Sequence, residues 1–122
     1  MKYLYLRKGL IETRNVQTGE TVYLNVTTEE LIRESLDTRP PAGFSYTDMK
    51  ARLRIDDAIK SQKLQTNFAD YLRLEDQDFE TLKNCVKDMR WNLRGQFIID
   101  FCESVLNYKD IAPVETPQVA VN

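Results

Sequence analysis

The chain has 122 residues, of which 17 are basic and 19 are acidic, so its formal net charge is -2 at neutral pH. This length favours one domain with a single hydrophobic core, and the near balance of charge gives no general affinity for a polyanion. The sequence contains no histidine, which removes the usual base of a serine or cysteine nucleophile. It also lacks a paired-cysteine metal motif and a glycine-rich phosphate loop. We therefore expect no catalytic residue, no metal site and no cofactor, and we expect that the protein is not an enzyme.

Three short strands are expected within residues 2–26, forming an antiparallel β-meander. The segments KYLYLR, LIETRNV and TVYLNV are separated by breaks at Lys8-Gly9 and Gln17-Thr18-Gly19. Glycine at each break would supply the positive φ that a tight hairpin needs. The third segment alternates aliphatic with polar or aromatic side chains, so its aliphatic face should cover a helix. These aliphatic residues are Val22, Leu24 and Val26.

Two helices are expected next. Thr27 and Glu30 form a capping-box pattern that opens a short helix, and the proline pair after it ends that helix. The second helix starts at a cap formed by Ser45 and Asp48 and continues to about Gln62. Its apolar side chains cover a wide arc, which indicates contact on two sides. They are Met49, Leu53, Ile55, Ala58 and Ile59.

The last two helices are expected to form a helical hairpin. Residues 71–74 alternate like a short strand and are a candidate fourth strand. Asp76 is the expected N-cap of the third helix, and residues 90–95 form the turn before the fourth. The fourth helix has apolar residues at the spacing of one helical face. They are Ile98, Phe101, Cys102, Val105 and Leu106.

These elements predict an α+β fold: a small N-terminal antiparallel β-meander packed against about four α-helices, ending in a helical hairpin and an extended tail. Residues 1–108 are expected to form the single domain. Residues 109–122 contain two prolines, little charge and no helical period, so we expect an extended or disordered tail. The alternative is that this tail docks on a partner or a sister subunit through its end, which contains Val119 and Val121.

The cysteines and the start of the chain bear on the cellular compartment. Cys85 and Cys102 are predicted on different helices, beside the apolar stripes, where they would be buried free thiols or a disulfide formed in an oxidising compartment. The start MKYLYLRKGL has too short an apolar run and no cleavage site for a signal peptide. No run approaches the roughly 18 apolar residues that a membrane span needs. We expect a cytoplasmic protein without a membrane partner.

Clustered carboxylates offer little support for catalysis. Asp56 and Asp57 are adjacent on a helix, so their side chains do not converge across a cleft. The cluster of Glu75, Asp76 and Asp78 is explained by its position at the start of a helix. An enzyme that uses carboxylates and a lysine base is an alternative, but no lysine is marked as desolvated by its neighbours in the sequence.

Basic residues in the second helix raise the alternative of nucleic-acid binding. They are spread around the helix and interleaved with acids, which is typical of a solvated face; they are Lys50, Arg52, Arg54, Lys60 and Lys63. If the last two helices formed a helix-turn-helix, the recognition helix would read QFIIDFCESVLN, with two acids and no base to meet phosphates. Nucleic acid is therefore a partner that the sequence does not favour.

A protein partner is favoured instead. Trp91, the one tryptophan, is expected at a turn, where it would either close the end of the core or anchor an interface together with Arg94. Tyr3, Tyr5 and Tyr23 form a second candidate surface on the predicted sheet, with ordinary strand composition as the alternative explanation. Self-association into a homo-oligomer is compatible with both surfaces.

The succession SYTDMKARLRIDDAI, YLRLEDQDFETLKNCVKDMRWNL and IIDFCESVL resembles small, largely uncharacterised proteins encoded by tailed bacteriophages and prophages. The resemblance spans about residues 21–107 and is carried by Leu74-Glu75-Asp76, Trp91 and the closing apolar helix. It implies a phage setting, in the host cytoplasm or the virion, among accessory or virion-assembly proteins. The expected function is a non-enzymatic protein-interaction module. The alternative is a small regulator that binds nucleic acid or a host transcription component.

Overall fold

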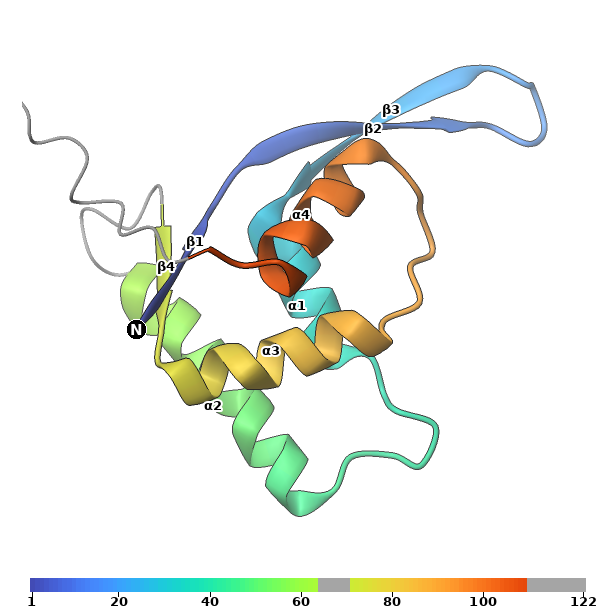
Figure 1. The fold of residues 1–122 in the computed structure, drawn as a ribbon. Coiled ribbons are helices and arrows are strands. Elements are labelled where there is room, and N and C mark those ends of the chain that lie inside the picture. Colours follow the sequence, from blue (N-terminus) through green and yellow to red (C-terminus); the bar gives the residue numbers. More distant parts are fainter. Residues whose placement is uncertain (64–70, 110–122) are drawn as a thin grey trace, which may run out of the picture.

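The computed structural model describes residues 1–63 and 71–109. Within these residues the chain forms an α+β fold with four helices and two small antiparallel sheets (Figure 1), which confirms the predicted fold class. The strands are β1 (Lys2–Tyr5), β2 (Lys8–Arg14), β3 (Thr21–Thr27) and β4 (Tyr71–Leu74). The helices are α1 (Thr28–Asp37), α2 (Tyr46–Lys63), α3 (Asp76–Asp88) and α4 (Gln96–Leu106). The predicted tail lies outside the described residues from residue 110 onward, as do Val119 and Val121.

The N-terminal strands are divided between two sheets. β2 and β3 form an antiparallel hairpin in which Ile11 lies opposite Leu24, whereas β1 pairs with β4, the candidate fourth strand. The chain does not turn back tightly between β1 and β2, because Arg7 is bound to the start of α1. The N–H of Thr28 donates to the Arg7 carbonyl at 2.9 Å, and the Arg7 N–H donates to the Thr28 hydroxyl at 3.0 Å.

The two N-terminal glycines have different roles. Gly19 has a φ of 77° between β2 and β3, as the hairpin turn requires. The expectation of a positive φ at Gly9 is wrong, because Gly9 lies within β2. A Cβ atom at Gly9 would lie 2.3 Å from Cδ1 of Phe97, so glycine at this position allows α4 to pack closely on the strand.

Two of the three predicted helix caps are confirmed. The Thr27 hydroxyl accepts from the Glu30 N–H at 3.1 Å, and the Glu30 carboxylate accepts from the Thr27 N–H at 2.8 Å, which completes the capping box of α1. The Ser45 hydroxyl accepts a hydrogen bond from the Asp48 N–H at 3.0 Å, as the predicted cap of α2 requires. The expected N-cap at Asp76 is wrong: Glu75 has the extended backbone of the cap, so Asp76 is already in the first turn of α3.

A residue of α2 closes the C-terminus of α1. Nη1 of Arg52 donates to the carbonyl oxygens of Ser35, Leu36 and Thr38 at 3.2, 2.9 and 3.2 Å. Nε of Arg52 donates to the Asp48 carboxylate at 2.9 Å. The last turn of α1 contains no basic residue, so Arg52 supplies the positive charge that the negative end of the helix dipole favours.

One hydrophobic core joins both sheets and the helices. Its most deeply buried apolar side chains are Ile11, Ile32, Ile55, Ile59, Leu72, Leu74, Leu82 and Val105. Phe101 is also buried, as the spacing along α4 predicts. The far end of the β2–β3 hairpin projects beyond the helices (Figure 1). Val22, near that end, is therefore 37% exposed, although Leu24 and Val26 on the same face are partly buried.

Within the described residues, α2 packs on the core through one face only. Ile55 and Ile59 are buried, whereas Met49 and Leu53 are 46% and 54% exposed. The fold therefore covers one side of the wide apolar arc of this helix. The predicted contact on a second side is not made within the described residues.

Candidate functional site

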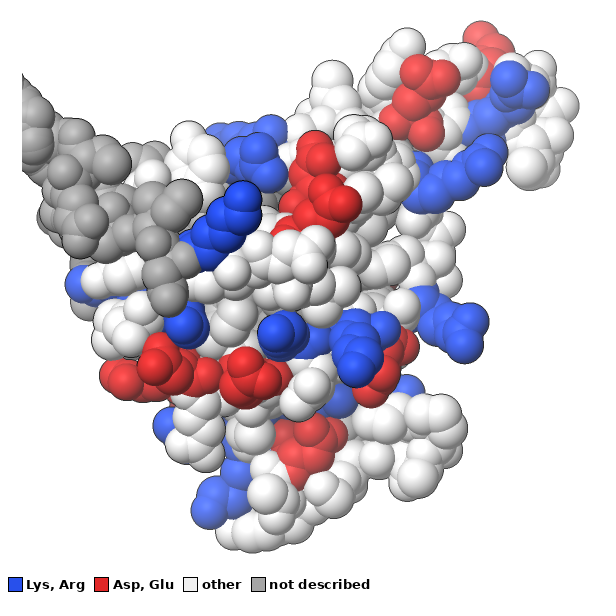
Figure 2. Space-filling model, viewed as in Figure 1, with Lys and Arg blue, Asp and Glu red and all other residues white. Residues whose placement is uncertain are grey.

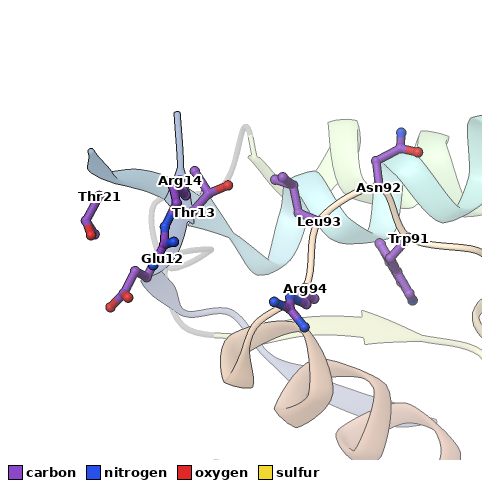
Figure 3. Close-up of a pocket in the computed structure, with 8 residues that line it drawn as sticks. All are labelled: Glu12, Thr13, Arg14, Thr21, Trp91, Asn92, Leu93 and Arg94. Atoms are coloured by element: carbon purple, nitrogen blue, oxygen red, sulfur yellow. The ribbon is translucent and has the colours of Figure 1, made fainter. Parts of the chain in front are cut away.

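A cleft of about 660 Å³ lies between the projecting hairpin and the loop that connects α3 to α4. We call it the hairpin–loop cleft. Figure 3 shows side chains of the hairpin on one side and side chains of the loop on the other. Its volume falls in the range of roughly 300–1,000 Å³ that is typical of ligand sites. The residues that line it are Glu12, Thr13, Arg14, Thr21, Trp91, Asn92, Leu93 and Arg94.

The cleft exists because β2 and the start of α4 are held together at its base. Ile11 is 1% exposed, and a Cβ atom at Gly95 would lie only 3.3 Å from Cγ2 of Ile11. Figure 1 shows the hairpin continuing past the start of α4 while the loop runs from α4 back to α3. The cleft is lined by side chains of both segments. Packing at Ile11, Gly95 and Phe97 therefore positions the polar side chains further out.

Trp91 packs against the core, which is one of the two roles predicted for it, and its role as an interface anchor stays a prediction. Its ring lies edge-on to Phe101, with ring centroids 6.2 Å apart, and it packs against the core. It also lines the cleft and remains partly exposed. Burial raises the pKa of the Cys102 thiol, and a hydrogen bond from the Trp91 side chain opposes this rise only in part. The thiol beside the cleft is therefore protonated at neutral pH and is not an activated nucleophile.

The cleft carries two arginines that the rest of the described chain leaves without an acidic partner. Arg14 and Arg94 are exposed, and neither forms an ion pair within residues 1–63 and 71–109. Glu12 is the acidic residue in the lining, so the local formal charge is +1. A guanidinium can bind a carboxylate through two parallel hydrogen bonds.

Sequence reasoning identified Trp91 and Arg94 but missed the hairpin side of the cleft. Arg14 lies opposite Thr21 in the last pair of the β2–β3 ladder. That register could have been derived from the turn around Gly19. The approach of this pair to residues 91–94 is a tertiary contact, which the spacing along the chain does not reveal.

The predicted tyrosine surface is split between the two sheets. Tyr5 on β1 packs against Tyr71 on β4, with ring centroids 5.1 Å apart, and the Tyr3 N–H donates to the Tyr108 hydroxyl at 2.9 Å. Tyr23 lies on β3, where it is 61% exposed. Tyr3 and Tyr5 therefore share a surface with each other and not with Tyr23.

The outer face of the hairpin also carries Leu10, which is 60% exposed. Leu10 lies opposite Asn25, and Tyr23 lies opposite Glu12, so Leu10 and Tyr23 are diagonal neighbours on one face. This places an exposed apolar pair on the same projecting hairpin that forms one wall of the cleft.

Most of the basic residues in α2 serve the fold. Arg54 pairs with Asp78 at 3.2 Å, and Lys60 pairs with Asp56 at 3.1 Å. Lys63 pairs with Glu29 at 3.0 Å. Figure 2 shows basic and acidic side chains interleaved over the visible face, with no extended basic patch. This pattern favours internal ion pairing over a surface for phosphates.

Two of these carboxylates have shifted pKa values. Burial alone would raise the pKa of Glu29, but hydrogen bonds from Lys63 and Arg33 outweigh it and lower the pKa. Burial likewise opposes the shift at Asp56, where contacts with Lys60 and Arg33 lower the pKa. Both carboxylates are ionised at neutral pH and are occupied by cations, so neither is available as a general acid.

The described ranges offer no metal site and no membrane span. They contain no group of three or more cysteine, aspartate or glutamate side chains that could hold a metal ion. Both cysteines are free thiols, and burial raises the pKa of Cys85. No helix in residues 1–63 and 71–109 is long and apolar enough to cross a membrane. The chain matches no protein-family model and has no significant match among curated proteins or solved structures.

Proposed function

We propose that the protein is a non-enzymatic interaction module that binds an acidic segment of a partner protein in the hairpin–loop cleft. The observation that carries this proposal is the pair of exposed guanidiniums, Arg14 and Arg94, that share a cleft with Trp91. The resemblance to small phage proteins suggests a bacteriophage accessory or virion-assembly factor. Its site of action would be the host cytoplasm or the assembling virion.

The lining residues support a peptide as the ligand. The two guanidiniums suit carboxylates, while Trp91 and Leu93 offer apolar surface for a side chain between two acidic residues. Tryptophan and arginine are the residues that most often dominate the binding energy of protein interfaces. Thr13, Thr21 and Asn92 add hydroxyl and amide groups that can bond to a peptide backbone.

The location of Trp91 provides a direct assay. Trp91 is the single tryptophan of the chain, so its fluorescence reports on the cleft without a label. We expect an acidic peptide that contains one aromatic residue, such as Glu-Glu-Tyr-Glu-Glu, to change this fluorescence. A peptide with lysine in place of each glutamate is the matched control. The affinity should fall as the salt concentration rises, because the ion pairs are exposed.

Charge reversal separates the cleft from general charge effects. The variant Arg14→Glu/Arg94→Glu should lose the binding of the acidic peptide, while Arg39→Glu/Lys87→Glu changes the net charge equally outside the cleft and should retain it. Equal binding by the two variants would contradict the proposal. The same variants can be used in affinity capture from the native host, with and without nuclease. Capture of nuclease-sensitive nucleic acid alone, lost in the cleft variant, would replace the proposal with the regulator alternative.

A further inference from the structure

A second hollow lies beside the hairpin–loop cleft, between the first turns of α1 and the loop that connects α3 to α4. It has a volume of about 300 Å³, and we call it the α1 hollow. Asn92 and Leu93 line both the cleft and the α1 hollow, so the two share a wall. A chain segment bound in the cleft can therefore reach the α1 hollow by passing this wall. The residues that line the hollow are Ile11, Val26, Glu30, Leu31, Glu34, Asn92, Leu93 and Ile98.

The floor of the α1 hollow is apolar. Ile11, Leu31 and Ile98 are 1%, 4% and 5% exposed, so they belong to the core and give the hollow a fixed base. Leu93 is 37% exposed and Val26 is partly buried, so both leave some apolar surface accessible. This surface can take the alkyl part of a ligand side chain, because the burial of apolar area favours binding.

Two carboxylates of α1 give the hollow its charge. Glu30 and Glu34 are four residues apart, so they lie on the same side of the helix, and both are exposed. Within the described part of the chain neither forms an ion pair; one oxygen of Glu30 accepts from the Thr27 N–H. Arg33, the basic residue of the same helix, is paired with other carboxylates. Like charges at this spacing repel each other, so a cation bound between them would be stabilised by both.

We propose that the α1 hollow binds a lysine or arginine side chain of the same partner segment whose acidic residues bind in the cleft. This inference rests on the proposed function and adds a second contact to its ligand. The alkyl stem of the basic side chain lies on the apolar floor, and its charged head lies between Glu30 and Glu34. Long basic side chains commonly bury their stems on apolar surface while their charge stays at the edge.

The combination of an apolar floor and acidic sides is the reason for choosing a basic side chain as the occupant. An aliphatic side chain would cover the same floor, but it would remove water from the two carboxylates without supplying a partner. A small inorganic cation would leave the apolar floor uncovered. The cleft offers Arg14 and Arg94 and the hollow offers Glu30 and Glu34, so the partner segment has acidic residues at one end and a basic residue at the other. This opposite charge fixes the direction in which the segment binds.

Peptides that differ in one side chain test the inference. The acidic peptide Glu-Glu-Tyr-Glu-Glu is extended at either end by a glycine spacer of varied length and then by lysine or by norleucine, which has an alkyl chain without the charge. At the best spacing we expect the lysine peptide to bind the wild type about fivefold more tightly than the norleucine peptide, as measured by Trp91 fluorescence. This gain should fall to about twofold or less in Glu34→Gln. It should be retained in Asp37→Asn, the matched control, which removes another exposed carboxylate of α1 that does not line the hollow.

Methyl NMR spectra locate the lysine stem independently of the affinity. The methyl resonances of Leu31 and Ile98 should shift when the lysine peptide binds and should stay in place when the unextended acidic peptide binds. Those of Leu53 on α2, outside the hollow, should not change with either peptide. Leu31 and Ile98 resonances that do not respond to the lysine peptide would reject the α1 hollow as its binding site.

The outcomes separate this inference from the proposed function. If acidic peptides bind in the cleft but gain nothing from lysine at any spacing, the inference is wrong and the proposed function stands. An equal lysine gain in the wild type and in both variants would also overturn the inference, because the gain would then come from the overall charge. If no acidic peptide binds in the cleft, the proposed function fails and the inference fails with it.

Discussion

Replacing Arg52 with methionine should destabilise the fold more than the replacement of a polar surface residue usually does. The guanidinium donates hydrogen bonds to three carbonyl oxygens at the end of α1 and to the Asp48 carboxylate. Its Cζ atom lies 5.0 Å from the centroid of the Phe44 ring. The side chain of Arg52 is only 13% exposed. Methionine keeps the apolar stem but removes every one of these hydrogen bonds.

The expected loss can be estimated from those contacts. A hydrogen bond to a charged group contributes about 1.5–3 kcal/mol, but one nitrogen serves all three carbonyls, so their contributions do not add in full. The loss of a cation from the C-terminus of α1 adds about 0.5–1 kcal/mol. We expect Arg52→Met to lower the free energy of unfolding by about 3 kcal/mol, which corresponds to a decrease of about 12 °C in Tm for a chain of this length.

Urea denaturation followed by far-UV circular dichroism measures this change. The matched control is Lys60→Met in the same helix, because the side chain of Lys60 is 65% exposed and pairs with Asp56 four residues earlier. An exposed pair of this kind contributes only about 0.3–0.5 kcal/mol. If Arg52→Met and Lys60→Met lower the stability by similar amounts, the role assigned to Arg52 in joining α1 to α2 is wrong.

Three further predictions concern the core, the strand–helix contact and the acid range. Phe101→Ala should lower the free energy of unfolding by about 3–5 kcal/mol, because the side chain is 2% exposed. If urea denaturation gives nearly the same free energy of unfolding for the variant and the wild type, the burial of Phe101 contributes little. Gly9→Ala should cost about 1–3 kcal/mol, because the new Cβ atom would lie 2.3 Å from the Phe97 ring; an unchanged Tm would show that the ring moves aside freely. Glu29 and Asp56 have pKa values below their ordinary values of 4.5 and 3.8, so the stability they contribute is present above those values and is lost as the pH falls through the lowered pKa values. The variant Glu29→Gln/Asp56→Asn should therefore lose less stability than the wild type as the pH falls through this range. Urea denaturation at a series of acid pH values measures this loss, and an equal loss in the two proteins would contradict the assignment.

Local signals in the sequence were sufficient for most helix starts. The capping box of Thr27 and Glu30 and the cap at Ser45 depend on residues three positions apart, and both are present. The role of Gly9 could not be found in this way. A glycine between two strand-like segments usually marks a turn, whereas here it makes room for Phe97, a residue 88 positions later in the sequence.

The candidate site was predictable only in part for the same reason. Trp91 and Arg94 stand out in the sequence because of their residue types and their place between two helices. Arg14 has no such signal, because its importance arises from the approach of the hairpin to the α3–α4 loop. The apolar arc of α2 shows the reverse case: it was visible in the sequence, and the structure identifies Met49 and Leu53 as the part of it that the fold leaves exposed.

The pairing of β1 with β4 has a consequence for how the chain folds. It joins residues about 70 positions apart, and the hydrogen bond from the Tyr3 N–H to the Tyr108 hydroxyl spans 105 positions. Contacts between distant residues slow folding, because a long loop must close before they form. The β2–β3 hairpin and α1 are contiguous and can form early during synthesis. Because β1 is synthesised well before its partner β4, it must wait until Tyr71–Leu74 emerges from the ribosome before the two strands can pair. In this interval the nascent chain is most exposed to misassociation.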